Sequence, residues 1–160
     1  MVEGILEAIY ISAKKGEPVK SVAQVHAVPG RGLEGDRYFL DPGASTKDHK
    51  ADREITLIEV EAVDAFCQEQ GITISPADIR RNLVLRGVQL NQLVDKKFKI
   101  GEVTLRRIRL CEPCQYLANR TLPEVLPGLL HRGGLRAEIL SEGEIRVGDG
   151  VDFIQEEARE

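Results

Sequence analysis

Apolar and polar residues alternate over short segments along most of the chain, a pattern typical of half-buried β-strands. Strands are expected over residues 3–12, 18–28, 53–58, 83–85, 98–110, 135–140 and 145–154. The alternation is interrupted between Val22 and Val25, which predicts a bulge or turn inside the second segment. In the last segment, the turn sequence Gly148-Asp149-Gly150 predicts a closing hairpin.

The segment 98–110 changes phase in its middle. Val103 and Leu105 fall on one face of the expected strand, whereas Ile108 and Leu110 fall in the opposite phase. One extra residue in a strand produces such a change, so a bulge or sharp bend is expected near Arg106-Arg107. Strands bend in this way where they turn the corner of a barrel.

One long helix is predicted, starting near Glu59. Apolar residues follow at helical spacing as far as Cys67, and Gly71 is a stop signal. The sequence Ser75-Pro76-Ala77-Asp78 has the capping serine, the proline and the acid of a short helix start. Seven or more short strands, one longer helix and short helical turns predict a mainly β fold, a closed or partly closed β-barrel. The 160 residues are expected to form a single domain, 1–160.

Composition narrows the range of partners and compartments. The net charge of −4 disfavours binding to nucleic acid by bulk electrostatics. No apolar run approaches the roughly 20 residues of a membrane-spanning helix. Acidic residues near the N-terminus and an odd number of cysteines, three, predict a cytoplasmic protein with reduced thiols.

Arginine outnumbers lysine by 14 to 8, and the arginines are clustered. The clusters are Arg80-Arg81, 106–109, and Arg132 with Arg136. A planar guanidinium suits carboxylate and phosphate, so a small anionic ligand is one interpretation, and solvated strand faces are the other. The tripeptide Arg80-Arg81-Asn82 stands just before an apolar strand, where its side chains suit hydrogen bonding better than core packing.

The main candidate for chemistry is the pair Cys111 and Cys114. It lies between an expected strand and a helix-compatible run, residues 115–120. The positive end of a helix dipole lowers the pKa of a cysteine there, which makes the thiolate available as nucleophile or metal ligand. The third cysteine, Cys67, lies on the apolar stripe of the predicted helix and is expected to pack as a small hydrophobe.

Several chemistries remain open for the pair. A structural zinc site needs two more ligands, but the remaining cysteine and three histidines form no second pair. A thioredoxin-like redox pair has the same local layout, yet this pair follows 110 residues of mostly β pattern and the chain lacks tryptophan. Simple packing of both thiols is disfavoured by Glu112 between them and the arginines before them. A fourth interpretation is a thiolate bound to a soft, anionic metal cofactor whose charged tail the arginines hold.

The sequence resembles the MOSC-domain family, named for the C-terminal domain of molybdenum cofactor sulfurases. The resemblance covers nearly the whole chain and rests on motifs in a characteristic order. These are Gly32-Leu33-Glu34-Gly35-Asp36-Arg37-Tyr38, Arg53-Glu54-Ile55-Thr56-Leu57-Ile58-Glu59, Ile79-Arg80-Arg81-Asn82-Leu83-Val84, Cys111-Glu112-Pro113-Cys114, Arg132-Gly133-Gly134 and Ile145-Arg146-Val147-Gly148-Asp149.

The resemblance implies a barrel-like β fold that binds molybdenum cofactor or handles its sulfur. It implies that Cys114 ligates molybdenum or carries sulfur as a persulfide. The Arg-x-Asn pattern that contacts the pterin in related amidoxime-reducing enzymes is matched by Arg80 and Asn82, with Arg81 where those enzymes have proline. All three are expected cofactor-binding residues. The implied reaction is reduction of N-hydroxylated small molecules. The alternatives are a non-catalytic sulfur relay between a donor and an acceptor protein and, third, a thiol-disulfide oxidoreductase.

Overall fold

The computed structural model describes residues 4–12, 19–36, 54–90, 97–110 and 134–154, and the side chains of 109 and 110 are not part of that description. The strands are β1 (Gly4–Ile11), β2 (Lys20–Val22), β3 (Gln24–Val28), β4 (Gly32–Leu33), β5 (Ile55–Glu59), β6 (Leu83–Arg86), β7 (Lys97–Ile100), β8 (Val103–Leu110), β9 (Leu135–Ile139), β10 (Gly143–Arg146) and β11 (Gly150–Phe153). The helices are α3 (Val60–Gln70) and α4 (Pro76–Ile79). The cysteine pair and the run after it lie outside the described residues.

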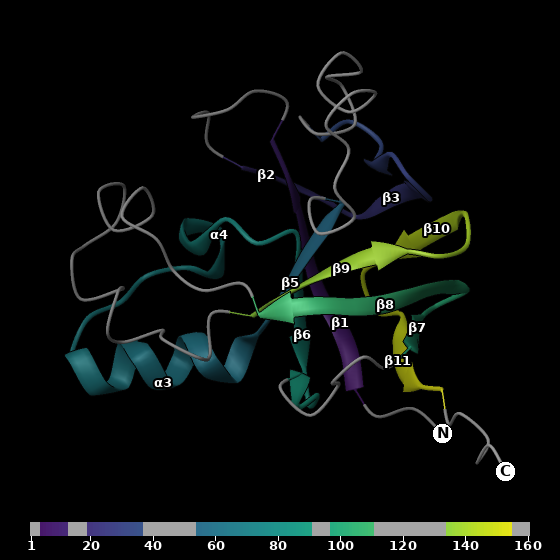
Figure 1. Ribbon diagram of the computed structural model, residues 1–160. Coiled ribbons are helices and arrows are strands. Elements are labelled where there is room, and N and C mark those ends of the chain that lie inside the picture. The colour runs from purple at the N-terminus through teal and green to yellow at the C-terminus, as the bar shows by residue number, and fades with distance from the viewer. Residues whose placement is uncertain (1–3, 13–18, 37–53, 91–96, 111–133, 155–160) are drawn as a thin grey trace, which may run out of the picture.

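The main sheet closes on itself. Its strand order is β11-β7-β8-β9-β5-β6-β1-β2, and β11 also pairs with β1. The pairing of Gly4 with Val151 joins the two ends, so seven strands form a closed barrel and β2 extends from β1 as an edge strand (Figure 1). This confirms the predicted mainly β fold and barrel.

Alternating apolar residues fill the barrel, as the period-two pattern predicts. On β7, Phe98 and Ile100 are fully buried while Lys97 and Lys99 are exposed. Strands β5, β6, β8 and β9 contribute to the same cluster. At about 25 cal/mol per Å² of apolar surface, this burial is the main stabilising term of the fold.

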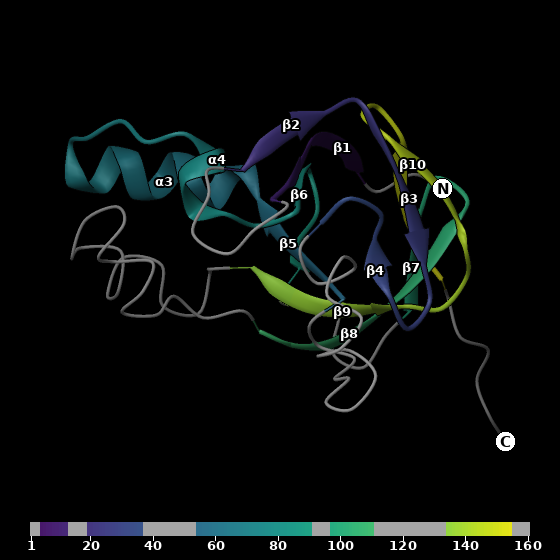
Figure 2. The same cartoon turned by 90° about the horizontal axis from the view of Figure 1, so that it is seen from above.

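A second, smaller core lies outside the barrel, between the helices and the sheet. Phe66 and Val63 of α3 and Ile79 of α4 pack against Ile58 and Val84, which point away from the barrel interior. Figures 1 and 2 place both helices beside β5 and β6. The helices connect β5 to β6, which are the parallel pair of the sheet, and such a connection needs a crossover. The sequence shows no regular alternation of strands and helices, but β5, the two helices and β6 form one βαβ unit.

Local signals placed both helices correctly. Helix α3 follows Glu59 and ends at Gly71, which adopts the left-handed conformation with φ of 67°. At α4, the Ser75 hydroxyl accepts a hydrogen bond from the Ala77 N–H at 3.0 Å, and the Asp78 carboxylate accepts one from the Ser75 N–H at 2.9 Å. This is the capping box that the sequence predicts.

The predicted irregularities are also present. A bend at Ala23 separates β2 from β3. Where β8 pairs with β9, the register shifts between Arg107 and Arg109, so Ile108 is the extra residue behind the change of phase. This confirms the bulge expected near Arg106-Arg107.

The predicted closing hairpin is wrong. The turn itself exists: the Arg146 N–H donates to the Asp149 carboxylate at 2.8 Å, and the Asp149 N–H donates to the Arg146 carbonyl at 3.0 Å. However, β10 pairs with β3 in a three-stranded sheet of order β10-β3-β4, whereas β11 pairs with β7 and β1. The turn therefore passes the chain from one sheet to the other. Strand β4 lies in a glycine-rich segment and pairs with β3.

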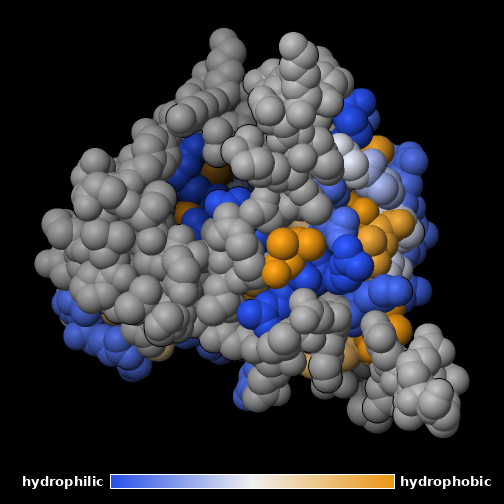
Figure 3. Space-filling model, viewed as in Figure 1, coloured by the Kyte–Doolittle hydropathy of each residue, from blue (hydrophilic) through white to orange (hydrophobic). Residues whose placement is uncertain are grey.

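The surface of the described residues is largely polar. Their exposed large hydrophobic side chains are Ile5, Leu140 and Val147. On the face in Figure 3 apolar atoms form small groups among hydrophilic ones. Within the described ranges, no helix has the length and apolar character to cross a membrane.

Candidate functional site

The predicted site residues Arg80, Arg81 and Asn82 form the connection between α4 and β6. Helix α4 ends at Arg80, which has φ of 67° and whose N–H donates to the Ala77 carbonyl at 3.1 Å. Among the described residues other than glycine, Arg80 alone has a positive φ. A side chain in this region costs free energy, and such residues concentrate at functional sites. The turn places the three polar residues at the start of a buried strand.

Asn82 ties three strands together. Its Oδ1 accepts hydrogen bonds from the N–H and the hydroxyl of Thr56, at 3.0 and 3.1 Å. Its Nδ2 donates to the Tyr10 carbonyl at 3.0 Å, and its main chain exchanges further bonds with the same two residues. The side chain predicted to contact a cofactor therefore joins β1, β5 and the start of β6. One Nδ2 hydrogen remains beyond these bonds.

Arg81 is buried, with only 8% of its surface exposed. Its Nη1 donates to the Ile79 carbonyl at 3.1 Å, which directs the guanidinium toward the end of α4. Cations are rarely buried unless they are paired or bind a ligand. The burial of Arg81 sets it apart from the solvated arginine that sequence alone also allowed.

Strand pairing relates these residues to the cysteine segment. Leu110, the residue before Cys111, pairs with Leu135, which pairs with Leu57, which pairs with Leu83, the residue after Asn82. The four leucines form one transverse row across β8, β9, β5 and β6. Three strand spacings of about 4.8 Å span roughly 14 Å along this curved row. The cysteine segment and the tripeptide Arg80-Arg81-Asn82 are therefore attached to the same stretch of barrel wall.

The next row toward Asn82 is polar. Arg109 pairs with Arg136, Arg136 pairs with Thr56, and Thr56 is hydrogen-bonded to Asn82. Arginines from two clusters that are far apart in sequence are therefore neighbours in space. The pairing confirms none of them as a ligand, but it makes one region of the wall rich in arginine.

Sequence reasoning did not single out Arg107, although it lies in one of the arginine clusters. It stands opposite Ala137, whose side chain belongs to the barrel core. Its Nε and Nη1 atoms are buried and have no hydrogen-bond partner within the part of the chain that the structure describes. The neighbouring Arg106 differs, because it is exposed and forms an ion pair with Glu138. Only the fold distinguishes the two, since their sequence context is the same.

A buried carboxylate near this wall, that of Glu54, has a structural role. Glu54 is 2% exposed, and its Oε1 accepts a hydrogen bond from the Ile139 N–H at 2.9 Å. This bond connects the start of β5 with the end of β9. The described residues contain no group of three or more His, Cys, Asp or Glu side chains that could hold a metal ion.

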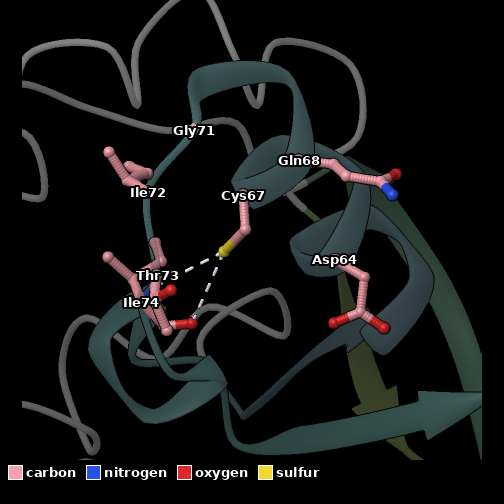
Figure 4. A pocket seen from close by; sticks show the side chains of 7 residues that line it. All are labelled: Asp64, Cys67, Gln68, Gly71, Ile72, Thr73 and Ile74. Atoms are coloured by element: carbon pink, nitrogen blue, oxygen red, sulfur yellow. Dashed lines mark hydrogen bonds between the residues drawn. The ribbon is translucent and has the colours of Figure 1, made fainter.

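Cys67 lies away from this wall, on α3. It is partly buried, packs against the outer core, and lines a shallow depression of about 570 Å³ (Figure 4). Its thiol donates to the Ile74 carbonyl at 3.6 Å and accepts from the Ile74 N–H at 3.4 Å. The thiol thus holds the loop after α3 in place, in addition to the packing role that the sequence predicts.

His26 has partners that the sequence could not reveal. Its Nδ1 lies 2.9 Å from a Glu144 oxygen and its Nε2 lies 2.7 Å from a Glu142 oxygen. Carboxylates only accept hydrogen bonds, so both contacts are satisfied only by the protonated ring. The hydrogen bonds to Glu142 and then Glu144 raise the pKa of His26 above 6.5. The ion pairs join β3 to β10 and its adjoining loop.

This arrangement predicts a pH-dependent stability. The folded state holds the proton more tightly, so the contribution of His26 is complete below pH 6.5, the unfolded value, and is lost as the pH rises through the higher folded pKa. We expect the urea midpoint of the wild type to fall over this range, relative to His26→Gln. Urea titrations at closely spaced pH values measure it. Parallel curves for both proteins would contradict the role of His26.

The fold and this wall define the class: a β-barrel domain with a cationic region beside the strand that leads to a Cys-x-x-Cys segment. A model of the MOSC domain family matches residues 43–152, and the chain belongs to this family. A comparison with curated proteins found no match.

Solved structures support the fold. The YuaD protein of Bacillus subtilis superposes with a TM-score of 0.78 at 17% identity, covering 94% of each chain. YiiM from Escherichia coli gives 0.69 at 15% identity, covering 97% of this chain and 72% of the other. YiiM from Geobacillus stearothermophilus gives 0.67 at 16%, covering 97% and 75%. At these identities the likeness is one of fold.

Proposed function

We propose that this protein binds molybdenum cofactor, with Cys114 as the ligand of molybdenum or as a carrier of sulfur in persulfide form. Family membership supports the proposal, because the MOSC domain is associated with this cofactor in general. Cys111 and Cys114 lie outside the described residues, so the role of Cys114 rests on its position in the family motif. In this proposal Arg80, Arg81 and Asn82 lie near the pterin or phosphate of the cofactor.

The observation that carries the proposal is the cationic character of the barrel wall. Nε and Nη1 of Arg107 are buried and have no hydrogen-bond partner among the described residues, and its strand β8 pairs with β9 through Arg109 and Arg136. Buried cations are costly unless an anionic group compensates them. An anionic cofactor next to the strand that leads to Cys114 fits this donor set. The wall therefore suits the cofactor that the family implies.

The residues have distinct roles in this proposal. Arg81 and its neighbours would hold the negative charge of the cofactor, and the bonds of Asn82 to Thr56 and Tyr10 would keep the turn that presents them rigid. A thiolate at Cys114 would hold the soft metal centre. When bound, the cofactor supplies two-electron redox chemistry, which suits reduction of N-hydroxylated small molecules.

A second candidate function is a sulfur relay without turnover. A thiolate with a lowered pKa also carries sulfane sulfur, which passes between a donor and an acceptor protein. Elemental and mass analysis of protein from a cofactor-competent host separates the two functions. Near-stoichiometric molybdenum supports the cofactor protein. A gain of about 32 Da on Cys114 without molybdenum supports the relay. Protein with neither would refute both.

A further inference from the structure

The barrel wall contains a guanidinium that the fold leaves without an acceptor. Arg107 is only partly exposed, and its Nε and Nη1 are fully buried. No oxygen of the described structure accepts a hydrogen bond from either atom. Nearly all buried polar groups in proteins are hydrogen-bonded, so an exception of this kind requires an explanation.

The neighbours of Arg107 on β8 and on the adjacent strand β9 are apolar or already form an ion pair. Its register partner, Ala137, is buried in the barrel core, and Ile108 forms the bulge that follows it. The nearest carboxylate by register is Glu138, which pairs with Arg106. Folding therefore removes Nε and Nη1 of Arg107 from water without an acceptor from β8 or β9. The protein bears a desolvation cost that a shape-matched apolar residue would avoid.

The geometry points to an oxyanion-binding site at Arg107. Each N–H of an arginine can donate to an oxygen of a phosphate or carboxylate, and Nε and Nη1 lie on different edges of the planar guanidinium, so each needs its own oxygen. Because the residue keeps partial exposure, an oxyanion can approach its guanidinium from the solvent. We propose that Arg107 binds a phosphate-type oxyanion. This inference deepens the proposed function, on which it rests for one point only: that the oxyanion in the cell is the cofactor's phosphate.

The site is tested first on protein without cofactor, purified from a host that cannot make it. Thermal unfolding is followed while inorganic phosphate is added at constant ionic strength, with sodium chloride and acetate as comparison series. We expect phosphate to raise the Tm of the wild type by several degrees, and acetate to raise it less. Arg107→Met should have a higher Tm without phosphate, because the buried charge is gone, and should not respond to phosphate.

Two further variants distinguish the N–H donors of Arg107 from the effect of positive charge in general. Arg107→Lys retains the charge but not the planar set of N–H donors, so it should respond weakly. Arg106→Met is the matched control, since Arg106 is exposed and paired with Glu138, and it should respond like the wild type. Equal phosphate responses of wild type and both Arg107 variants would overturn the site. If Arg107→Met unfolds, the comparison of Arg107→Lys with Arg106→Met decides in the same way.

Pterin content then tests the link to the cofactor. In a cofactor-competent host, Arg107→Met should retain several-fold less pterin per folded protein than the wild type, while Arg106→Met retains as much. A phosphate response that depends on Arg107, together with no pterin in the wild type, would keep the oxyanion site and refute the proposed function. Full pterin content in Arg107→Met would refute the assignment of the oxyanion to the cofactor.

Discussion

Replacing Asn82 with alanine is expected to lower the free energy of unfolding by about 3 kcal/mol, since three side-chain hydrogen bonds are lost and each contributes about 1 kcal/mol. The bonds are those from the Thr56 N–H and hydroxyl to Oδ1, and from Nδ2 to the Tyr10 carbonyl. They connect β5 and β1 with the start of β6. Urea unfolding followed by circular dichroism measures the change.

Gln24→Ala is the matched control for this effect. The Gln24 amide also bridges strands, but it accepts one exposed hydrogen bond, from Arg146 Nε at 3.3 Å. Its loss should change the free energy of unfolding by less than about 0.5 kcal/mol. If both variants are equally stable, the amide of Asn82 is not needed for the fold and is available to a ligand. The result therefore decides how any loss of cofactor in an Asn82 variant is interpreted.

The sequence predicts those parts of the fold that local patterns determine. The change of phase between Leu105 and Ile108 located the bulge, because an extra residue alters the face of every residue after it. The caps at Ser75 and Gly71 located the ends of the helices, because the cap bonds form within a few residues. These features need no knowledge of distant strands.

Strand partners could not be predicted in this way. Alternation identifies β10 and β11 as strands and Asp149 marks the turn, but nothing local states that β10 pairs with β3. The partners of His26 are hidden for the same reason, since Glu142 and Glu144 are 116 and 118 residues away. Hydrogen bonds between strands that are distant in sequence are consequences of topology.

The candidate site also has features that local sequence predicts and features that depend on strand pairing. Polar residues before a buried strand marked Arg80, Arg81 and Asn82 as unusual, and the structure shows Arg81 buried and Asn82 hydrogen-bonded to Thr56. The bridging role of Asn82 depends on Thr56, 26 residues earlier, and the missing partners of Arg107 depend on pairing with β9. A count of arginines cannot separate a solvated guanidinium from a buried one.

Cys114→Ala is expected to abolish molybdenum loading, whereas Cys111→Ala is expected to keep most of it. A thiolate ligand supplies a direct bond to the metal, and loss of even an outer-shell partner lowers metal affinity by roughly 10- to 100-fold. Cys67→Ala is a further control, because its thiol is hydrogen-bonded to Ile74 and packs against the outer core. Each variant is first shown to be folded by a cooperative unfolding transition, and the metal contents are then compared.

The most direct test of the account is the molybdenum content of wild type, Cys114→Ala and Cys111→Ala, purified from one cofactor-competent host and normalised to folded protein. If Cys114 ligates molybdenum, the metal should be present in the wild type and in Cys111→Ala, with a loss of more than about tenfold in Cys114→Ala. Equal molybdenum in the wild type and in Cys114→Ala would contradict it.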